Sequence, residues 1–202
     1  MANNYEKVFK LFAKRYILVP LEIFQDPYRT LISTVLSART RDETTLAVSQ
    51  KLFAKAPTIE ALNQLPQEDI QTLIHGVGFY KTKAKHLKKL AHIVVIDYKG
   101  VIPNTVDELQ KLPGVGIKTA NLTLNRAFGK PAIAVDIHVH RITNLMGWVN
   151  TKTPEQTEKE LSKVLPKKYW RDINRYFVSI GRQFQSKKKL LEFLEENKLL
   201  PQ

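Results

Sequence analysis

The stretch from Lys111 to Arg141 constrains the fold more than any other part of this 202-residue chain. It begins with Leu112-Pro113-Gly114-Val115-Gly116, where two glycines can supply the positive φ angles that a tight turn needs. Apolar residues then recur at helical spacings, at Ile117, Ala120, Leu124 and Phe128. The sequence therefore predicts a hairpin that leads directly into a helix.

The start of that helix is predicted to bind an anion. The backbone N–H groups of Gly116 and its neighbours should lack partners within the helix, and they lie at the positive end of its dipole. Lys118 falls in the first helical turn, where the same dipole disfavours a cation. A lysine in this unfavourable place, next to an anion site, indicates a chemical role.

A carboxylate begins the next helical pattern. Asp136 stands at an N-cap position before the apolar residues Val139, Ile142 and Leu145. Taken alone, Asp136 is explained equally well as a plain helix cap. Together with Lys118 it forms an amine and a carboxylate at two helix starts, a combination that suits attack on a sugar carbon beside a bound phosphate.

The charge of the chain indicates the kind of partner. Lysine and arginine number 32 against 19 aspartates and glutamates, which gives a formal net charge of +13. Such an excess favours nucleic acid first and an acidic membrane surface second. The membrane is the weaker alternative, because no apolar run approaches the ~20 residues of a spanning helix. No signal-peptide core is visible, so we expect an intracellular protein of the cytoplasm or nucleoid.

Helical spacing recurs along the rest of the chain, and the expected fold class is all-α. We expect helices around residues 5–12, from 27, at 44–54, 58–65, 67–74, 81–97, from 139, from 154, at 170–180 and within 187–200. The segment Ile74-His75-Gly76-Val77-Gly78 echoes the main hairpin. It is either a second turn that faces phosphate or a plain turn between helices.

The motifs resemble those of the helix-hairpin-helix, glycine/proline-Asp superfamily of DNA glycosylases, and most closely its endonuclease III branch. The resemblance rests on LPGVGxKTA at residues 112–120 and VDxHVxR at 135–141, and it extends from about residue 20 to about 183. It implies two helical domains: residues 21–130 with the helix-hairpin-helix, and residues 1–20 plus 131–202. It also implies a catalytic cleft between them.

The resemblance also implies roles for individual residues. Lys118 matches the nucleophilic lysine of the family and Asp136 its catalytic aspartate. The hairpin residues Gly114, Val115 and Gly116 would hold a DNA phosphate.

Two further residues match loops that read the duplex in the family. Phe79 matches a loop that inserts an apolar side chain, and Arg39 stands where relatives carry a glutamine that fills the gap left by the displaced base. An arginine can stack on an orphaned base and donate to it, although Arg39 is also interpretable as a solvated cation at a helix end.

Cysteine is absent from the chain, which excludes disulfides, thiolate zinc sites and cysteine-ligated clusters. The resemblance would place the first of four iron–sulfur ligands at about Gln185. We expect instead that a terminal helix with Leu190, Leu191 and Leu194 on one face covers that surface. By resemblance, the carbonyls of Gln110, Leu112 and Val115 would hold a monovalent cation, Na⁺ or K⁺.

The predicted function is a bifunctional DNA glycosylase and abasic-site lyase of base excision repair, acting on oxidised pyrimidines in double-stranded DNA as a monomer. Two alternatives remain. One is a mismatch or 8-oxoguanine glycosylase of the same superfamily. The other is a non-catalytic DNA-binding protein, which would need neither Lys118 nor Asp136.

Overall fold

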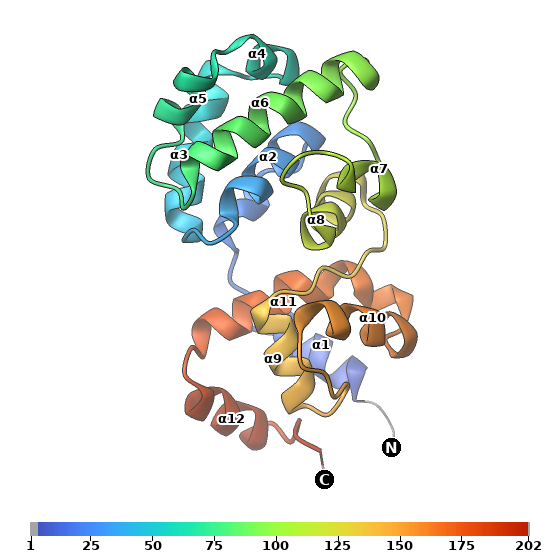
Figure 1. Ribbon diagram of the computed structural model, residues 1–202. Coiled ribbons are helices and arrows are strands. Elements are labelled where there is room, and N and C mark those ends of the chain that lie inside the picture. The colour runs from blue at the N-terminus through green and yellow to red at the C-terminus, as the bar shows by residue number, and fades with distance from the viewer. Residues whose placement is uncertain (1–3, 202) are drawn as a thin grey trace. The chain divides into compact units, whose positions relative to one another are not determined.

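The computed structural model describes residues 4–201, and every regular element in that range is helical (Figure 1). The predicted all-α class is confirmed. The elements are α1 (Tyr5–Lys14), η1 (Pro20–Ile23), α2 (Pro27–Ser37), α3 (Asp42–Lys55), α4 (Ile59–Gln64), α5 (Gln67–Leu73), α6 (Tyr80–Asp97), α7 (Val106–Gln110), α8 (Ile117–Phe128), α9 (Ile137–Leu145), α10 (Pro154–Val164), η2 (Lys167–Tyr169), α11 (Trp170–Gln183) and α12 (Lys187–Glu196). Within this range no helix combines the length and the apolar character that crossing a membrane requires.

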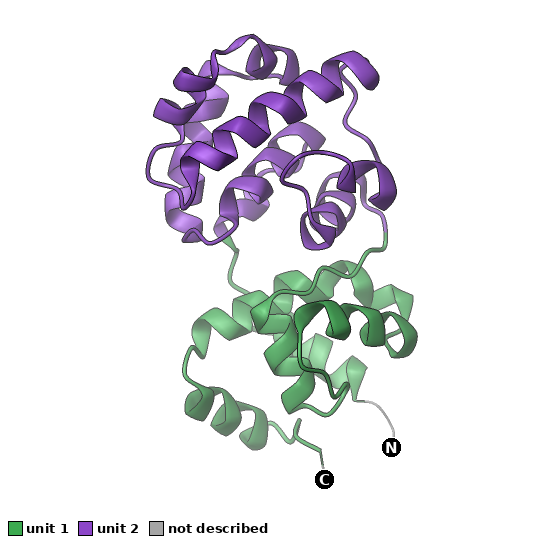
Figure 2. Cartoon of the chain, viewed as in Figure 1, with its two compact units in different colours: residues 1–19, 131–202 green, residues 20–130 purple. Residues whose placement is uncertain are grey.

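The chain forms two compact units: one of residues 20–130, the other of residues up to 19 together with those from 131 onward (Figure 2). In the first, residues 30–36 of α2 are all buried, as expected of a helix inside a domain. Asp26 caps α2 through a hydrogen bond from the Arg29 N–H to its Oδ1 at 2.8 Å, and Pro27 holds the first helical position. Helices α3 and α8 pack directly against α2.

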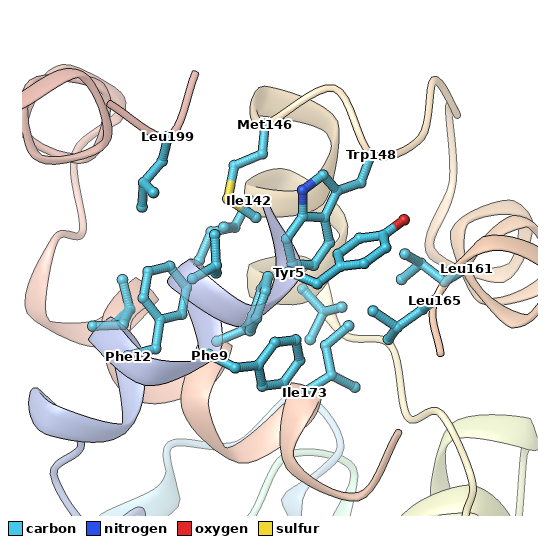
Figure 3. Packing of buried hydrophobic residues seen from close by; sticks show 14 of the residues in the cluster. Tyr5, Phe9, Phe12, Ile142, Met146, Trp148, Leu161, Leu165, Ile173 and Leu199 are labelled. Carbon is cyan, nitrogen blue, oxygen red and sulfur yellow. The ribbon is translucent and has the colours of Figure 1, made fainter. Parts of the chain in front are cut away.

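The second unit has an aromatic core, in which α1 packs against α11 (Figure 3). The ring of Tyr5 meets that of Trp148 edge-on at 4.6 Å, and Phe12 meets Phe177 of α11 at 5.0 Å. Such pairs contribute about 0.5–1.5 kcal/mol each beyond the burial of their area. The core therefore joins a helix from the beginning of the chain to helices from its last third.

Helix α12 completes this core with Leu190, Phe193 and Leu194. The expected face was partly wrong, because Leu191 is only half-buried and Phe193 takes the inward position instead. Phe193 stacks on Phe184 with ring centroids 4.3 Å apart. Helix α12 is thus part of the hydrophobic core of its unit.

Leu194 is fully buried, so Leu194→Ala should lower the free energy of unfolding by about 2–5 kcal/mol. Chemical denaturation followed by circular dichroism would measure the loss. Glu196→Ala, an exposed change on the same helix, is the matched control and should stay within about 0.5 kcal/mol of the parent. Equal stability of the two variants would mean that α12 does not contribute to the core.

Candidate active site

The hairpin between α7 and α8 depends on Gly114, whose φ is +82°. A Cβ there would also lie 3.0 Å from Nδ1 of His86 on α6, so glycine is needed for its conformation and for the close approach. The prediction that both glycines have positive φ is wrong for Gly116, which is extended with φ −92° and ψ 176°. Gly116 instead begins α8, and nothing lies within 4 Å of the place a Cβ would take. Its backbone is therefore open to a ligand.

Val115 anchors the hairpin between these two glycines. Its side chain is buried, and its N–H donates to the Leu112 carbonyl at 3.1 Å. Gly116 provides no side-chain cap, and the first turn of α8 contains no acidic residue. The N–H groups of that turn therefore lack the partner that most helices provide for themselves. This arrangement is suited to holding a phosphate.

Lys118 occupies the second position of α8 and is exposed. Within residues 4–201 its ammonium has no acidic partner. A cation at this end of a helix is opposed by the dipole, and no ion pair compensates for it here. Lys118 therefore stands beside the uncapped helix start as a side chain free to react.

Asp136 is the N-cap of α9, as the sequence predicted. Its Oδ1 accepts hydrogen bonds from the N–H groups of His138 and Val139, both at 2.9 Å. Within the described residues its Oδ2 has no partner. The preceding segment is fixed because the Asn174 side chain donates to the carbonyl of buried Ala134 at 3.1 Å. The cap therefore orients the carboxylate and leaves Oδ2 available to contact a ligand.

The structure brings Arg39 and Phe79 together, although 39 positions separate them in sequence. Both side chains are exposed, and the Arg39 guanidinium carbon lies 5.5 Å from the centre of the Phe79 ring. Both residues have left-handed backbones, with φ of +54° and +58°. The turn before Phe79, which the sequence left open, packs against the Arg39 turn: a Cβ on Gly78 would lie 2.6 Å from the Arg39 carbonyl oxygen.

Sequence reasoning missed Lys83, which is buried on α6 with 6% of its surface exposed. A signal was present, because Lys83 lies at helical spacing from the apolar residues Leu87 and Leu90. Lysines are rarely buried unless their charge is hydrogen-bonded.

Lys118 and Asp136 belong to different units, residues 20–130 and residues from 131 onward.

Comparison with known proteins defines the class. Residues 32–167 match the family model described as HhH-GPD superfamily base excision DNA repair protein. The chain belongs to this superfamily. Within it, the chain is similar to endonuclease III of Thermotoga maritima, with 51% identity over 158 residues that cover 78% of this chain and 74% of that protein.

Two solved structures extend the likeness. A trapped endonuclease III–DNA covalent intermediate has a TM-score of 0.82 at 34% identity, covering 91% of this chain and 85% of that one. A thermostable thymine-DNA glycosylase has a TM-score of 0.85 at 26% identity, covering 96% of this chain and 92% of that one. The predicted class, an endonuclease III-like glycosylase and lyase of base excision repair, is confirmed.

The residues of this chain do not fit the iron–sulfur cluster that the resemblance implies. Such clusters are held by cysteine thiolates, and the chain has none. Gln185, at the expected first ligand, accepts a hydrogen bond through its backbone carbonyl from Nη1 of Arg141 at 3.0 Å. Among residues 4–201 no cluster of three His, Cys, Asp or Glu side chains could hold a metal ion.

We therefore expect the purified protein to be colourless and to contain no stoichiometric iron, because it lacks thiolate ligands. Elemental analysis and the visible absorption spectrum would measure this. Incision of damaged DNA should proceed at the same rate after treatment with a strong iron chelator. A loss of incision that added iron restores would contradict this expectation.

Proposed function

We propose that this protein removes oxidised pyrimidines from double-stranded DNA and then cleaves the strand at the resulting abasic site. The observation that carries the proposal is Lys118, an unpaired lysine in the first turn of a helix whose start is uncapped and follows a glycine hairpin. The hairpin of Gly114, Val115 and Gly116 holds a backbone phosphate, and Lys118 reaches the adjacent sugar. The similarity to endonuclease III and to a trapped endonuclease III–DNA covalent intermediate supports this chemistry.

The target nucleotide first leaves the helical stack, at a cost of a few kcal/mol that damaged bases lower. The neutral amine of Lys118 attacks C1′, and the bond from C1′ to the base breaks. The base leaves with a proton. The C1′–O4′ bond then breaks, O4′ takes a proton, and the opened sugar is held as an imine on the Lys118 nitrogen. Loss of a C2′ proton then breaks the C3′–oxygen bond, which cleaves the strand by β-elimination.

Asp136 supplies negative charge to this reaction. Positive charge develops on the sugar as the base departs, and a fixed carboxylate stabilises it more than mobile water does. The free Oδ2 is suited to this role and to proton transfer, while Oδ1 remains bound to the start of α9. Asp136 and Lys118 thus act on the same sugar.

The remaining features of the proposal follow from the substrate. The protein acts as a monomer inside the cell, where DNA is found. The carbonyls of Gln110, Leu112 and Val115 hold a Na⁺ or K⁺ ion that bridges the hairpin to phosphate. The Leu112 carbonyl already accepts the Val115 N–H, and its second lone pair is left for the ion.

A second candidate is a mismatch-specific glycosylase, which the likeness to a thymine-DNA glycosylase favours. An incision assay on matched duplexes containing thymine glycol, a mismatched thymine, 8-oxoguanine or an abasic site separates the candidates. We expect thymine glycol and the abasic site to be cleaved fastest. Cleavage of the mismatched thymine alone would establish the second candidate, and no cleavage of any duplex would leave only a DNA-binding protein.

Lys118→Ala should abolish the covalent complex that borohydride traps between the protein and abasic-site DNA, because the imine nitrogen is lost. Denaturing electrophoresis would measure the trapped species, and binding to undamaged duplex should stay close to that of the parent. Lys55→Ala, an exposed change at the end of α3, is the control and should trap normally. Undiminished trapping by Lys118→Ala would remove Lys118 from the mechanism.

Asp136→Asn should slow base removal by about 10²–10³-fold while leaving the melting temperature nearly unchanged, since asparagine caps a helix about as well as aspartate. Single-turnover kinetics would measure the rate. Asp26→Asn makes the same chemical change at the N-cap of α2 and should leave the rate of the parent. If both variants react at the parent rate, Asp136 is only a cap.

A further inference from the structure

Lys83 is the only charged residue buried among the described residues, and no step proposed above uses it. Burial of an ammonium is costly unless each N–H has an acceptor. Lys83 has three acceptors: the carbonyls of Leu36 at 2.7 Å and Ala38 at 2.6 Å, and Oγ1 of Thr40 at 3.3 Å. Burial lowers the pKa of Lys83 to about 8, so the amine still carries its third proton at neutral pH. Three donors therefore match three acceptors.

These acceptors surround Arg39. Ala38 precedes it and Thr40 follows it, so Lys83 bonds to the backbone carbonyl before this residue and to the side-chain hydroxyl after it. The left-handed backbone of Arg39 is unfavourable for a residue other than glycine, and persists only where its surroundings fix it. Lys83 supplies that fixation from a different helix.

Other hydrogen bonds of Lys83 and Thr40 reach the turn that carries Phe79. The backbone N–H of Lys83 donates to the Phe79 carbonyl at 3.0 Å, and the N–H of Gly78 donates to Thr40 Oγ1 at 3.0 Å. Thr40 Oγ1 is thus shared by the Lys83 ammonium and the turn that carries Phe79. A continuous chain of hydrogen bonds links the two turns.

We propose that Lys83 is a positioning residue. It holds the Arg39 turn and the Phe79 turn in one fixed arrangement, in which both side chains contact damaged DNA. The inference rests on the proposed function. The pair presents an apolar ring that enters the stack beside the displaced nucleotide and a guanidinium that donates to the base left opposite. Holding both groups in place before binding removes the cost of ordering them on the duplex.

A direct contact between Lys83 and phosphate is excluded by burial, since 6% of the residue is exposed and its amine is already surrounded by acceptors. Lys85 on the same helix is exposed and provides the matched control. Lys83→Met removes the donors and keeps most of the side-chain volume. Thr40→Val removes only the shared hydroxyl, so the inference stays testable if Lys83→Met fails to fold.

The experiment compares base excision from a thymine-glycol duplex with cleavage of a preformed abasic site, each opposite all four bases, under single-turnover conditions. Lys83→Met should slow base excision by about 10–100-fold and reduce its dependence on the opposite base, because Arg39 and Phe79 are misplaced. Cleavage of the abasic site should change much less, since that site has no base to unstack. Lys85→Met should match the parent in both reactions. Equal slowing of both reactions by Lys83→Met would reduce Lys83 to general stability and overturn the inference.

A double-mutant comparison provides the second readout. If Lys83 acts through the pair, Lys83→Met should have little further effect in a variant that already carries Arg39→Ala and Phe79→Ala. If Lys83→Met slows base excision by the same factor in that variant as in the parent, the inference is overturned. If the parent protein excises no base, the proposed function and this inference are both overturned. If the parent is active and Lys83→Met excises the base at the same rate, only the inference is overturned.

Discussion

The proposed chemistry of this protein depends on the N–H groups at the starts of helices, which have no partner within the helix. At α8 the chain places Gly116 and no capping side chain, which leaves those groups for a phosphate. At α9 it places Asp136, whose Oδ1 accepts two of them. The first N–H groups of a helix need acceptors from outside the helix. At α8 this need creates an open anion site beside Lys118, and at α9 it fixes the orientation of the Asp136 carboxylate and leaves Oδ2 free. Each proposed reactive group takes its position from a helix start.

The missing cysteines change what must hold the second unit together. A cluster would fasten the chain after α11 through metal–thiolate bonds. In their place Arg141 donates to the carbonyls of Phe184 and Gln185, and Phe193 stacks on Phe184. That region is therefore held by hydrogen bonds, burial and aromatic packing.

Local patterns were sufficient for much of this structure and insufficient for the rest. The all-α class, the Gly114 turn and the Asp136 cap follow from spacing and residue type within a few positions. Residue spacing did not predict helix α7, because five residues are too few for a periodicity. The pairing of Arg39 with Phe79 depends on two turns that meet only in the folded chain. Lys83 interrupts an apolar pattern. The sequence does not explain why a lysine is buried there, because its three acceptors come from residues 36–40, which are distant in the chain.

The backbone at Phe79 shows where ordinary helix rules give way. Among the described residues other than glycine, four have positive φ, and three of them, Arg39, Lys99 and Lys198, directly follow the C-cap of a helix. A left-handed residue often ends a helix there, although glycine usually occupies that position. Phe79 instead precedes a helix, where an extended residue with a capping oxygen is preferred, and it provides none. The exposed ring does not help α6 to form, and the backbone of Phe79 contributes only its carbonyl, which accepts the Lys83 N–H. Because exceptions to local rules concentrate at functional or strained sites, this backbone agrees with the proposed role of Phe79 on DNA.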